Sequence, residues 1–197
     1  MLPATRSLLP LVLALAACVS SNDLHESGVL GDTSSFESRG PDLLVQRLAS
    51  DEQLATYKRV RIDRVHVFFE PGCAGLDLPA SSQRLLAKRF GRALRSEVGE
   101  HYELVQDLGL VQDDVLRIRV TLTEVNLAHT DSDEVANATV EVEVVDALTG
   151  QRVAAAVSRR SARETPSSAD DSLDEADHAF GQWALNLREW LDTFMSS

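Results

Sequence analysis

The stretch Leu116–Thr123 (LRIRVTLT) decides the fold class, because apolar and polar residues alternate strictly along it. Leucine, isoleucine and valine occupy one set of alternate positions, and arginine and threonine occupy the other set. A period of two is typical of a β-strand with one buried face and one polar face. The sequence therefore predicts a sheet that packs one of its faces on a core.

A second alternating stretch follows, and a turn joins it to a third. Residues 138–144 (ATVEVEV) place alanine and valine on one face and threonine and glutamate on the other. Residues 146–150 (DALTG) then supply hairpin chemistry, because aspartate starts turns and glycine adopts a positive φ. We expect residues 151–160 (QRVAAAVSRR) to return as the partner strand.

Two stretches show helical periodicity. Within residues 80–98, apolar residues recur every three or four positions, which predicts a buried face made of Leu86, Phe90, Ala93, Leu94 and Val98. Residues 172–194 carry both tryptophans of the chain, Trp183 and Trp190, on one apolar stripe. A lone helix of this kind is expected to pack on a sheet, since a coiled coil needs more heptads.

The remaining segments complete the predicted architecture. Residues 59–69 (RVRIDRVHVFF) are rich in β-branched and aromatic residues and predict a strand, as does the short stretch 102–105. Residues 43–57 are ambiguous between a strand and a helical turn. The expected fold class is α+β, with a mostly antiparallel sheet of about five strands and two amphipathic helices packed on it.

Composition and charge limit the function. The chain has 197 residues, and its 31 acidic residues against 19 lysines and arginines give a formal net charge of −12. A surface this acidic disfavours nucleic acid as a partner, because phosphate contacts need clustered cations. The two cysteines are too few for a disulfide framework.

The N-terminus predicts a compartment. Arg6 is followed by an apolar run, Ser7–Ala17, which is too short to span a bilayer and is typical of a secretory signal peptide. The run ends in Leu15-Ala16-Ala17-Cys18, which resembles a bacterial lipobox, where a peptidase cuts before a cysteine that carries diacylglycerol. Cys18 is therefore the predicted lipid attachment site, and its acyl chains are the predicted membrane contact.

This pattern divides the chain into three parts. We expect a lipoprotein signal peptide at residues 1–17, a lipidated N-terminus and tether at 18–42 that begins to dock on the domain, and a single α+β domain at 43–197. Residue 19 is valine rather than aspartate, which in a diderm bacterium indicates the outer membrane. The expected location is the cell envelope, with the domain facing the periplasm.

Three features together resemble a known family. Residues 27–34 (SGVLGDTS) and residues 54–65 (LATYKRVRIDRV) look like the opening and the first strand of the bacterial lipoproteins known as domain-of-unknown-function family 3313. The alternating strands and the tryptophan-bearing last helix follow in the order of that family. Thr33 stands where the family usually has tyrosine. The family has no established activity, so the resemblance implies a fold and a location but no chemistry.

Candidate chemical groups are few. No hydrolase, zinc-protease, phosphate-loop or dinucleotide motif is present. Residues 129–134 (HTDSDE) lack the glycine turn and the ligand spacing of a calcium loop, so we predict no metal and no cofactor. Cys73 is expected to be a buried or inert thiol, with an intermolecular disulfide in the oxidising periplasm as the alternative. Asp63 and His66 are possible buried polar partners, for which neutralisation by Arg61 or Arg64 is the favoured explanation.

One basic patch opposes the acidic character of the chain. It lies on the predicted 80–98 helix, opposite the apolar face, and consists of Arg84, Lys88, Arg92 and Arg95. Such a row is either a solvated face or a contact for anionic headgroups, lipopolysaccharide phosphates or an acidic partner.

These observations lead to three hypotheses. The first is a non-enzymatic, lipid-anchored envelope lipoprotein that serves as an interaction or accessory module, with an envelope protein complex as a possible partner. The second is a periplasmic carrier of a small ligand or lipid, with its cleft under the helix that bears Trp183 and Trp190. The third is a hydrolase that uses Asp63, His66 or Cys73.

Overall fold

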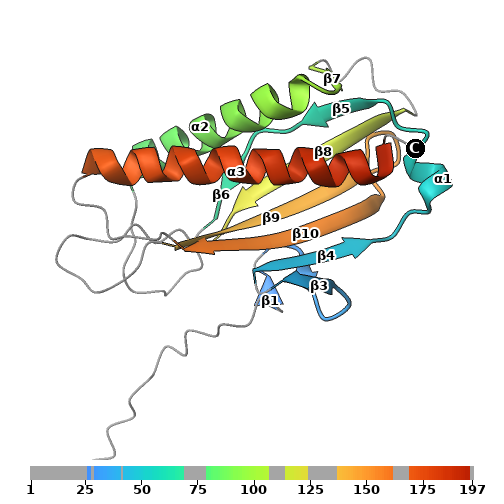
Figure 1. The fold of residues 1–197 in the computed structure, drawn as a ribbon, viewed down its shortest axis with the longest axis horizontal. Helices are drawn as coiled ribbons and strands as arrows, with labels where there is room; N and C mark the ends of the chain where they lie inside the picture. The colour runs from blue at the N-terminus through green and yellow to red at the C-terminus, as the bar shows by residue number, and fades with distance from the viewer. Residues whose placement is uncertain are drawn as a thin grey trace, which may run out of the picture.

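The structure is a computed structural model that describes residues 26–27, 29–40, 42–68, 79–106, 114–123, 137–161 and 169–195 (Figure 1). The strands are β1 (Glu26–Ser27), β2 (Gly31–Asp32), β3 (Glu37–Gly40), β4 (Leu43–Arg47), β5 (Arg59–Ile62), β6 (His66–Val67), β7 (Glu103–Leu104), β8 (Val115–Leu122), β9 (Asn137–Asp146) and β10 (Arg152–Ser161). The helices are α1 (Asp51–Leu54), α2 (Ala80–Gly99) and α3 (Ala169–Met195).

Eight of these strands form one open sheet. Seven of them are neighbours in the order β3-β4-β10-β9-β8-β5-β7. The eighth, β6, pairs with the part of β8 that follows its pairing with β5. Neighbouring strands from β3 to β8 are antiparallel. The pairs β5–β8, β5–β7 and β6–β8 are parallel. β1 and β2 form a separate two-stranded ribbon.

The α+β class is confirmed, but the expected sheet of about five mostly antiparallel strands with two helices is wrong. The observed sheet has eight strands and mixed pairing, and α1 is a third helix. The parallel pair β5–β7 follows from α2, which lies between β6 and β7 in the chain. A helical crossover returns the chain to the end of the sheet where it started, so the next strand runs parallel to the first.

Several predicted elements have different boundaries. The strand expected at 59–69 is divided into β5 and β6, and its last residue lies outside the described residues. The ambiguous segment 43–57 contains both a strand, β4, and a helical turn, α1. α3 begins at Ala169, ahead of the predicted start at residue 172.

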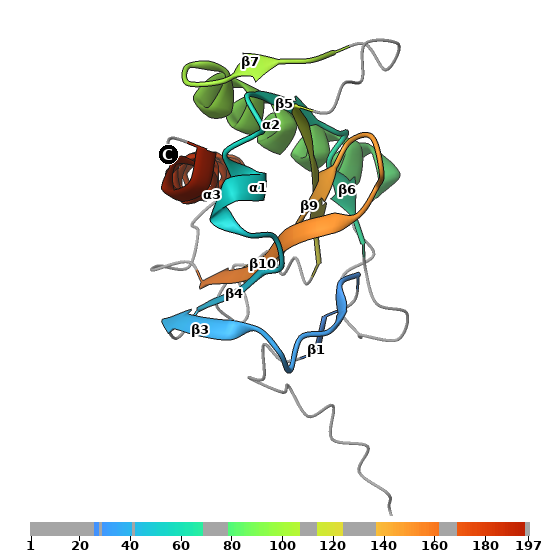
Figure 2. The same ribbon diagram turned by 90° about the vertical axis from the view of Figure 1, so that its right-hand side faces the viewer.

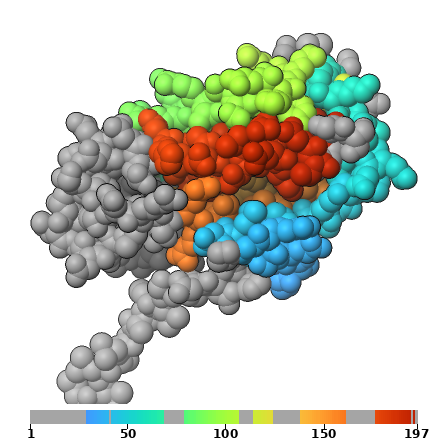
Figure 3. All heavy atoms as spheres, viewed as in Figure 1, coloured from blue at the N-terminus to red at the C-terminus, as the bar shows by residue number. Residues whose placement is uncertain are grey.

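The two long helices pack side by side on one face of the sheet (Figures 1 and 2). Between them and the sheet lies a core in which Phe90 stacks on Phe180, with ring centroids 4.8 Å apart, and Trp183 lies 5.8 Å from Phe90. Figure 3 shows the outer sides of α2 (green) and α3 (red) as one continuous surface above β10 (orange). The helix-covered face is therefore a packed apolar layer.

The N-terminal segment lies on the opposite face of the sheet (Figure 2). A second, smaller apolar cluster forms there from Leu30, Phe36, Leu44, Ala155 and Val157. β3, which belongs to the segment expected to be tether, pairs with β4 and extends the sheet. The docking of residues 29–40 thus covers the β10 side of this face.

The β9–β10 hairpin forms as expected. Asp146 Oδ1 accepts hydrogen bonds from the backbone N–H groups of Leu148 (3.0 Å) and Thr149 (2.6 Å), and Gly150 has a φ of +72°. The other carboxylate oxygen of Asp146 accepts a hydrogen bond from the buried Tyr57 hydroxyl at 2.8 Å. Burial, together with the Asp146 carboxylate, raises the pKa of Tyr57 from 10.0 to about 12.

Candidate functional site

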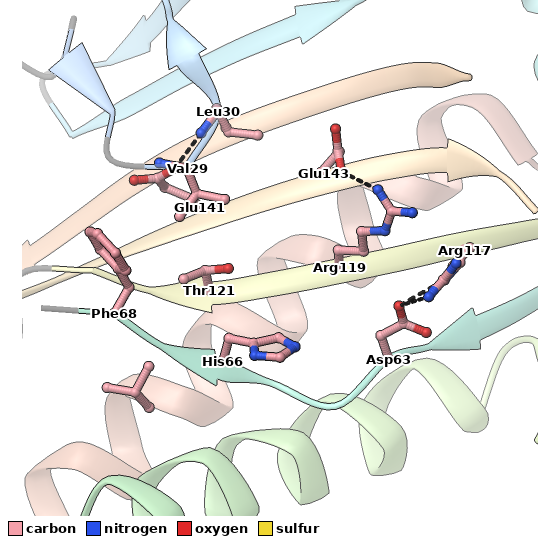
Figure 4. A pocket seen from close by; sticks show the side chains of 11 residues that line it. Val29, Leu30, Asp63, His66, Phe68, Arg117, Arg119, Thr121, Glu141 and Glu143 are labelled. Carbon is pink, nitrogen blue, oxygen red and sulfur yellow. Dashed lines mark hydrogen bonds and ion pairs between the residues drawn. The ribbon is translucent and has the colours of Figure 1, made fainter. Parts of the chain in front are cut away.

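The half of the second sheet face that the N-terminal segment leaves open forms a groove. The even-numbered residues of β8 point into the helix-covered core, so Arg117, Arg119 and Thr121 lie on the open side. A cavity of about 480 Å³ lies over these residues (Figure 4). Its lining comprises Val29, Leu30, Asp63, His66, Val67, Phe68, Arg117, Arg119, Thr121, Glu141 and Glu143.

One end of the groove is built on Asp63, which follows β5. Asp63 Oδ1 accepts a hydrogen bond from Arg61 Nε at 3.1 Å, and Oδ2 accepts one from Arg117 Nε at 2.7 Å. Burial alone raises the pKa of a carboxyl group, but the two guanidinium groups outweigh it and hold the pKa of Asp63 below its usual 3.8. Asp63 is therefore a carboxylate at neutral pH.

A second ion-pair group lies one strand further along. Glu143 on β9 accepts hydrogen bonds from Arg119 Nη1 and from Arg152 Nε, both at 2.8 Å. Burial raises the pKa of Glu143, and the two arginines lower it by more, so that its pKa lies below the usual 4.5. Figure 4 shows the two ion pairs of the groove, Arg117 with Asp63 and Arg119 with Glu143.

The turn between β1 and β2 forms a wall of the groove. Glu141, which is 3% exposed, accepts hydrogen bonds from the backbone N–H groups of Val29 (3.0 Å) and Leu30 (2.9 Å). Gly31 follows with a φ of +76°, a conformation that residues with a Cβ rarely adopt. A buried carboxylate thus fixes the N-terminal turn over the sheet from a position more than a hundred residues later in the chain.

The far end of the groove is apolar. Phe68 lies beside the end of β8, where its N–H donates to Leu122 O at 2.8 Å. Val29, at 50% exposure, and Phe68, at 40%, are two of the five large apolar side chains that stand exposed in the described part of the chain. A ligand that covers apolar side chains in a cavity gains binding free energy, because their surface leaves water.

The basic row predicted on α2 is present as an exposed row. Arg84, Lys88, Arg92 and Arg95 are all exposed. None of the four has an ion-pair partner among the residues that the structure describes, whereas Arg89 on the same helix pairs with Asp177 of α3 at 2.6 Å. The row is thus open to solvent and is separate from the groove, whose lining it does not enter.

The other predicted positions have mixed outcomes. Asp63 is neutralised by Arg61, as favoured from the sequence, and by Arg117, which sequence reasoning missed; Arg64 is exposed. His66 lines the groove without a hydrogen bond to Asp63. Cys18, Cys73 and residues 129–134 lie outside the described residues.

Sequence reasoning missed the groove because the alternation in β8 and β9 predicts a polar face but not what lies on it. The available signal was one pair of opposite charges on two adjacent strands, since Arg119 lies directly across from Glu143 in the register. Charges that face each other across strands are expected to pair.

The cleft expected under the tryptophan-bearing helix finds no support in the packing. Trp183 is 4% exposed, contacts Phe90 and Phe180, and donates from Nε1 to Ser158 Oγ at 3.2 Å. Trp190 is half-buried against the same core. The side chains that an apolar cleft would need are used for packing, which argues against a carrier of that design.

Within the described residues, no helix combines the length and the apolar character needed to cross a bilayer. Groups of three or more histidine, cysteine, aspartate or glutamate residues arranged to hold a metal ion are likewise absent from the described part.

A family model described as "Protein of unknown function (DUF3313)" matches residues 25–187. The chain belongs to this family. The resemblance noted from the sequence is thereby confirmed, and two of the DUF3313 segments that carried it now have positions in the structure. Residues 27–34 contain the turn that Glu141 holds, and residues 54–65 contain β5 and Asp63. No curated protein sequence matches the chain.

Three solved structures are similar to this DUF3313 protein at low sequence identity. XCC0632 of Xanthomonas campestris is 7% identical and has a TM-score of 0.50, with 74% of this chain and 90% of that one covered. The PelC dodecamer of Paraburkholderia phytofirmans is 15% identical, with a TM-score of 0.45 and coverage of 73% and 96%. A minor lipoprotein of Acinetobacter baumannii is 14% identical, with a TM-score of 0.44 and coverage of 70% and 94%. The likeness to XCC0632 supports the fold alone.

Proposed function

We propose that this DUF3313 protein is a non-enzymatic, lipid-anchored lipoprotein of the outer membrane whose domain faces the periplasm and binds a protein partner in the envelope. The observation that carries the proposal is Leu15-Ala16-Ala17-Cys18 at the end of a short apolar run. The thiol of a cysteine at this position forms a thioether with a diacylglyceryl group. Two or three acyl chains hold a protein stably on a bilayer.

The state of the acidic groups in the groove supports a binding role over catalysis. Asp63 and Glu143 are each held by two guanidinium groups, and both have a lowered pKa. A general acid or base works best when its pKa lies near the operating pH, which neither carboxylate satisfies. His66 makes no hydrogen bond to Asp63 that would orient it as a base.

The basic row on α2 is the proposed partner contact. Its four cations project from one helix, and within the described residues none of them is neutralised by an ion pair. Leu85, which is 40% exposed, adds an apolar contact next to Arg84. A row of cations favours a partner with an acidic surface.

The anchor is tested by Cys18→Ser in the native cells. We expect the wild-type protein in the membrane fraction and the variant in the soluble periplasmic fraction, because the variant has no thiol to acylate. A variant that remains in the membrane fraction after a high-salt wash contradicts the anchor.

The partner contact is tested by cross-linking in cells followed by identification of the attached protein. Reversal of Arg84, Lys88 and Arg92 to glutamate should remove most of the cross-linked partner. Reversal of Arg39, Lys58 and Arg64, which are also exposed and lie outside α2, changes the net charge by the same amount and should leave it. Equal loss in both variants, or recovery of lipid or glycan without protein, contradicts the proposed contact.

A further inference from the structure

The carboxylates at the charged end of the groove are already bound within the protein. Asp63, Glu141 and Glu143 line the groove together with Arg117 and Arg119. Asp63 and Glu143 each pair with one of these two arginines and with one that does not line the cavity, Arg61 and Arg152 respectively. Glu141 is buried and accepts from two backbone N–H groups. Four guanidinium groups are thus gathered around three carboxylates, in a chain with a formal net charge of −12.

Arg119 has donors to spare. Within the described residues it makes one hydrogen bond, through Nη1 to Glu143, and its side chain is 41% exposed. Its Nε and Nη2 groups therefore remain able to donate to an anion in the groove. A guanidinium group suits a carboxylate or a phosphate, because it presents two parallel donors to two oxygens.

The strand register orders the groove from charged to apolar. Arg119 lies across from Glu143, His66 pairs with Thr121, and Phe68 comes next, at the end of β8. At about 3.3 Å per residue, the distance along β8 from Arg119 to the level of Phe68 is about 13 Å. Val29 and Leu30 lie over the Thr121 level because Glu141, which faces Thr121, binds them.

From this arrangement we propose that the groove binds a single-chain anionic amphiphile, with its carboxylate or phosphate head on Arg117 and Arg119 and its alkyl chain between Val29 and Phe68. A cavity of about 480 Å³ suits one alkyl chain with a small head. The site lies on the opposite face of the sheet from the tryptophan-bearing helix α3. It is independent of the basic row on α2 and of the proposed anchor at Cys18.

The direct test is calorimetric titration of the whole mature chain, residues 18–197, carrying Cys18→Ser so that no attached acyl chain competes. The probes are decanoate and decyl phosphate, with decanol and inorganic phosphate as controls that each lack one half of the ligand. We expect at least one anionic probe to bind at least about tenfold more tightly than both controls. The preferred probe identifies the head as a carboxylate or a phosphate.

Matched variants locate the binding site. Arg119→Gln should weaken binding at least about tenfold, whereas Arg152→Gln should leave it unchanged, because Arg152 also pairs with Glu143 but does not line the groove. Phe68→Ser should weaken binding, whereas Leu148→Ser, at a more exposed apolar residue on the hairpin, should not. Circular dichroism checks that each variant is folded.

Three results overturn the inference. The first is decanol binding as tightly as decanoate and decyl phosphate, which removes the role of the cations. The second is inorganic phosphate binding as tightly as decyl phosphate, which removes the role of the apolar end. The third is folded Arg119→Gln protein that binds like the wild type. None of them bears on the membrane fractionation of the Cys18→Ser variant, so the two proposals fail separately.

Discussion

The two faces of the sheet differ in what covers them. On one face, α2 and α3 bury alternate residues of β8, namely Leu116, Ile118, Val120 and Leu122, at 1% exposure or less. On the other face, the N-terminal segment covers only part of the surface, and the intervening residues Arg117 and Arg119 border a groove. The same strand thus contributes a dry core on one side and a polar, solvent-open site on the other.

This difference shows how a small domain separates stability from binding. The apolar residues of β8 gain free energy by leaving water, which needs only a matching apolar surface. The arginines of β8 carry charges that are costly to bury without a partner, so this face needs carboxylates and solvent beside them.

Phe90→Ala should cost the most stability. Phe90 is 1% exposed and packs on Phe180 and Trp183, so its removal leaves a cavity in the helix-covered core. We expect the free energy of unfolding in urea to fall by about 3–5 kcal/mol. Phe68→Ala, at an exposed phenylalanine on the other face, should cost less than about 1 kcal/mol. Similar losses in the two variants contradict the contrast between the faces.

Glu141→Ala tests how the N-terminal turn is held. The variant leaves the N–H groups of Val29 and Leu30 without their acceptor, and we expect a loss of about 2 kcal/mol in the free energy of unfolding. Amide hydrogen exchange at these two residues should accelerate, while exchange in β8 should stay slow. Glu37→Ala, at an exposed residue of β3, is the control and should change neither. Unchanged exchange at Val29 and Leu30 contradicts this role of Glu141.

Asp63→Asn should cost about 1–2 kcal/mol at pH 7, because it removes the anion that Arg61 and Arg117 share. The pKa of Asp63 is lowered in the folded protein, so its contribution is present above the unfolded pKa and is lost as the pH falls through the folded pKa. Urea unfolding should therefore show the variant and the wild type converging below about pH 4. A constant difference down to acid pH contradicts the ion pair.

Tyr57→Phe should have the smallest effect, about 1 kcal/mol at pH 7, from loss of the hydrogen bond to Asp146. The pKa of Tyr57 is raised to about 12, so its contribution is complete below the unfolded value near 10 and is lost as the pH rises toward 12. The two proteins should then converge in alkaline solution, whereas the Asp63 pair converges in acid. Phenolate absorbance that appears at the ordinary pKa of tyrosine contradicts the burial of Tyr57.

Local patterns predicted the elements better than their connections. The helical periodicity of residues 80–98 predicted α2 and its buried face, because that face is encoded by the spacing of a few apolar residues. The parallel pairing of β5 with β7 was missed, since it depends on the path of α2 over the sheet and not on any residue within the strands. The strands β1 and β2 were missed because two residues carry no detectable period.

The candidate sites show the same division. The basic row on α2 was predicted because its four residues share one face of one helix. The groove was missed because its lining comes from the β1–β2 turn, the β5–β6 segment, β8 and β9, which are distant in sequence. Asp63 was selected from the sequence, but its second partner, Arg117, lies 54 residues away and becomes visible only when β5 pairs with β8.

The sequence by itself determined the α+β class, the family, the amphipathic α2, the β9–β10 hairpin and the exposure of the basic row, because each depends on residues that are near one another in the chain. Tertiary structure alone decided the strand order, the mixed pairing and the groove. The physical reason is that a cross-strand ion pair, or a buried carboxylate that binds a distant turn, needs contacts between segments whose proximity the folded sheet creates. The turn held by Glu141 is the clearest case: residues 27–34 carried the family resemblance, and their place in the molecule follows from one side chain on β9.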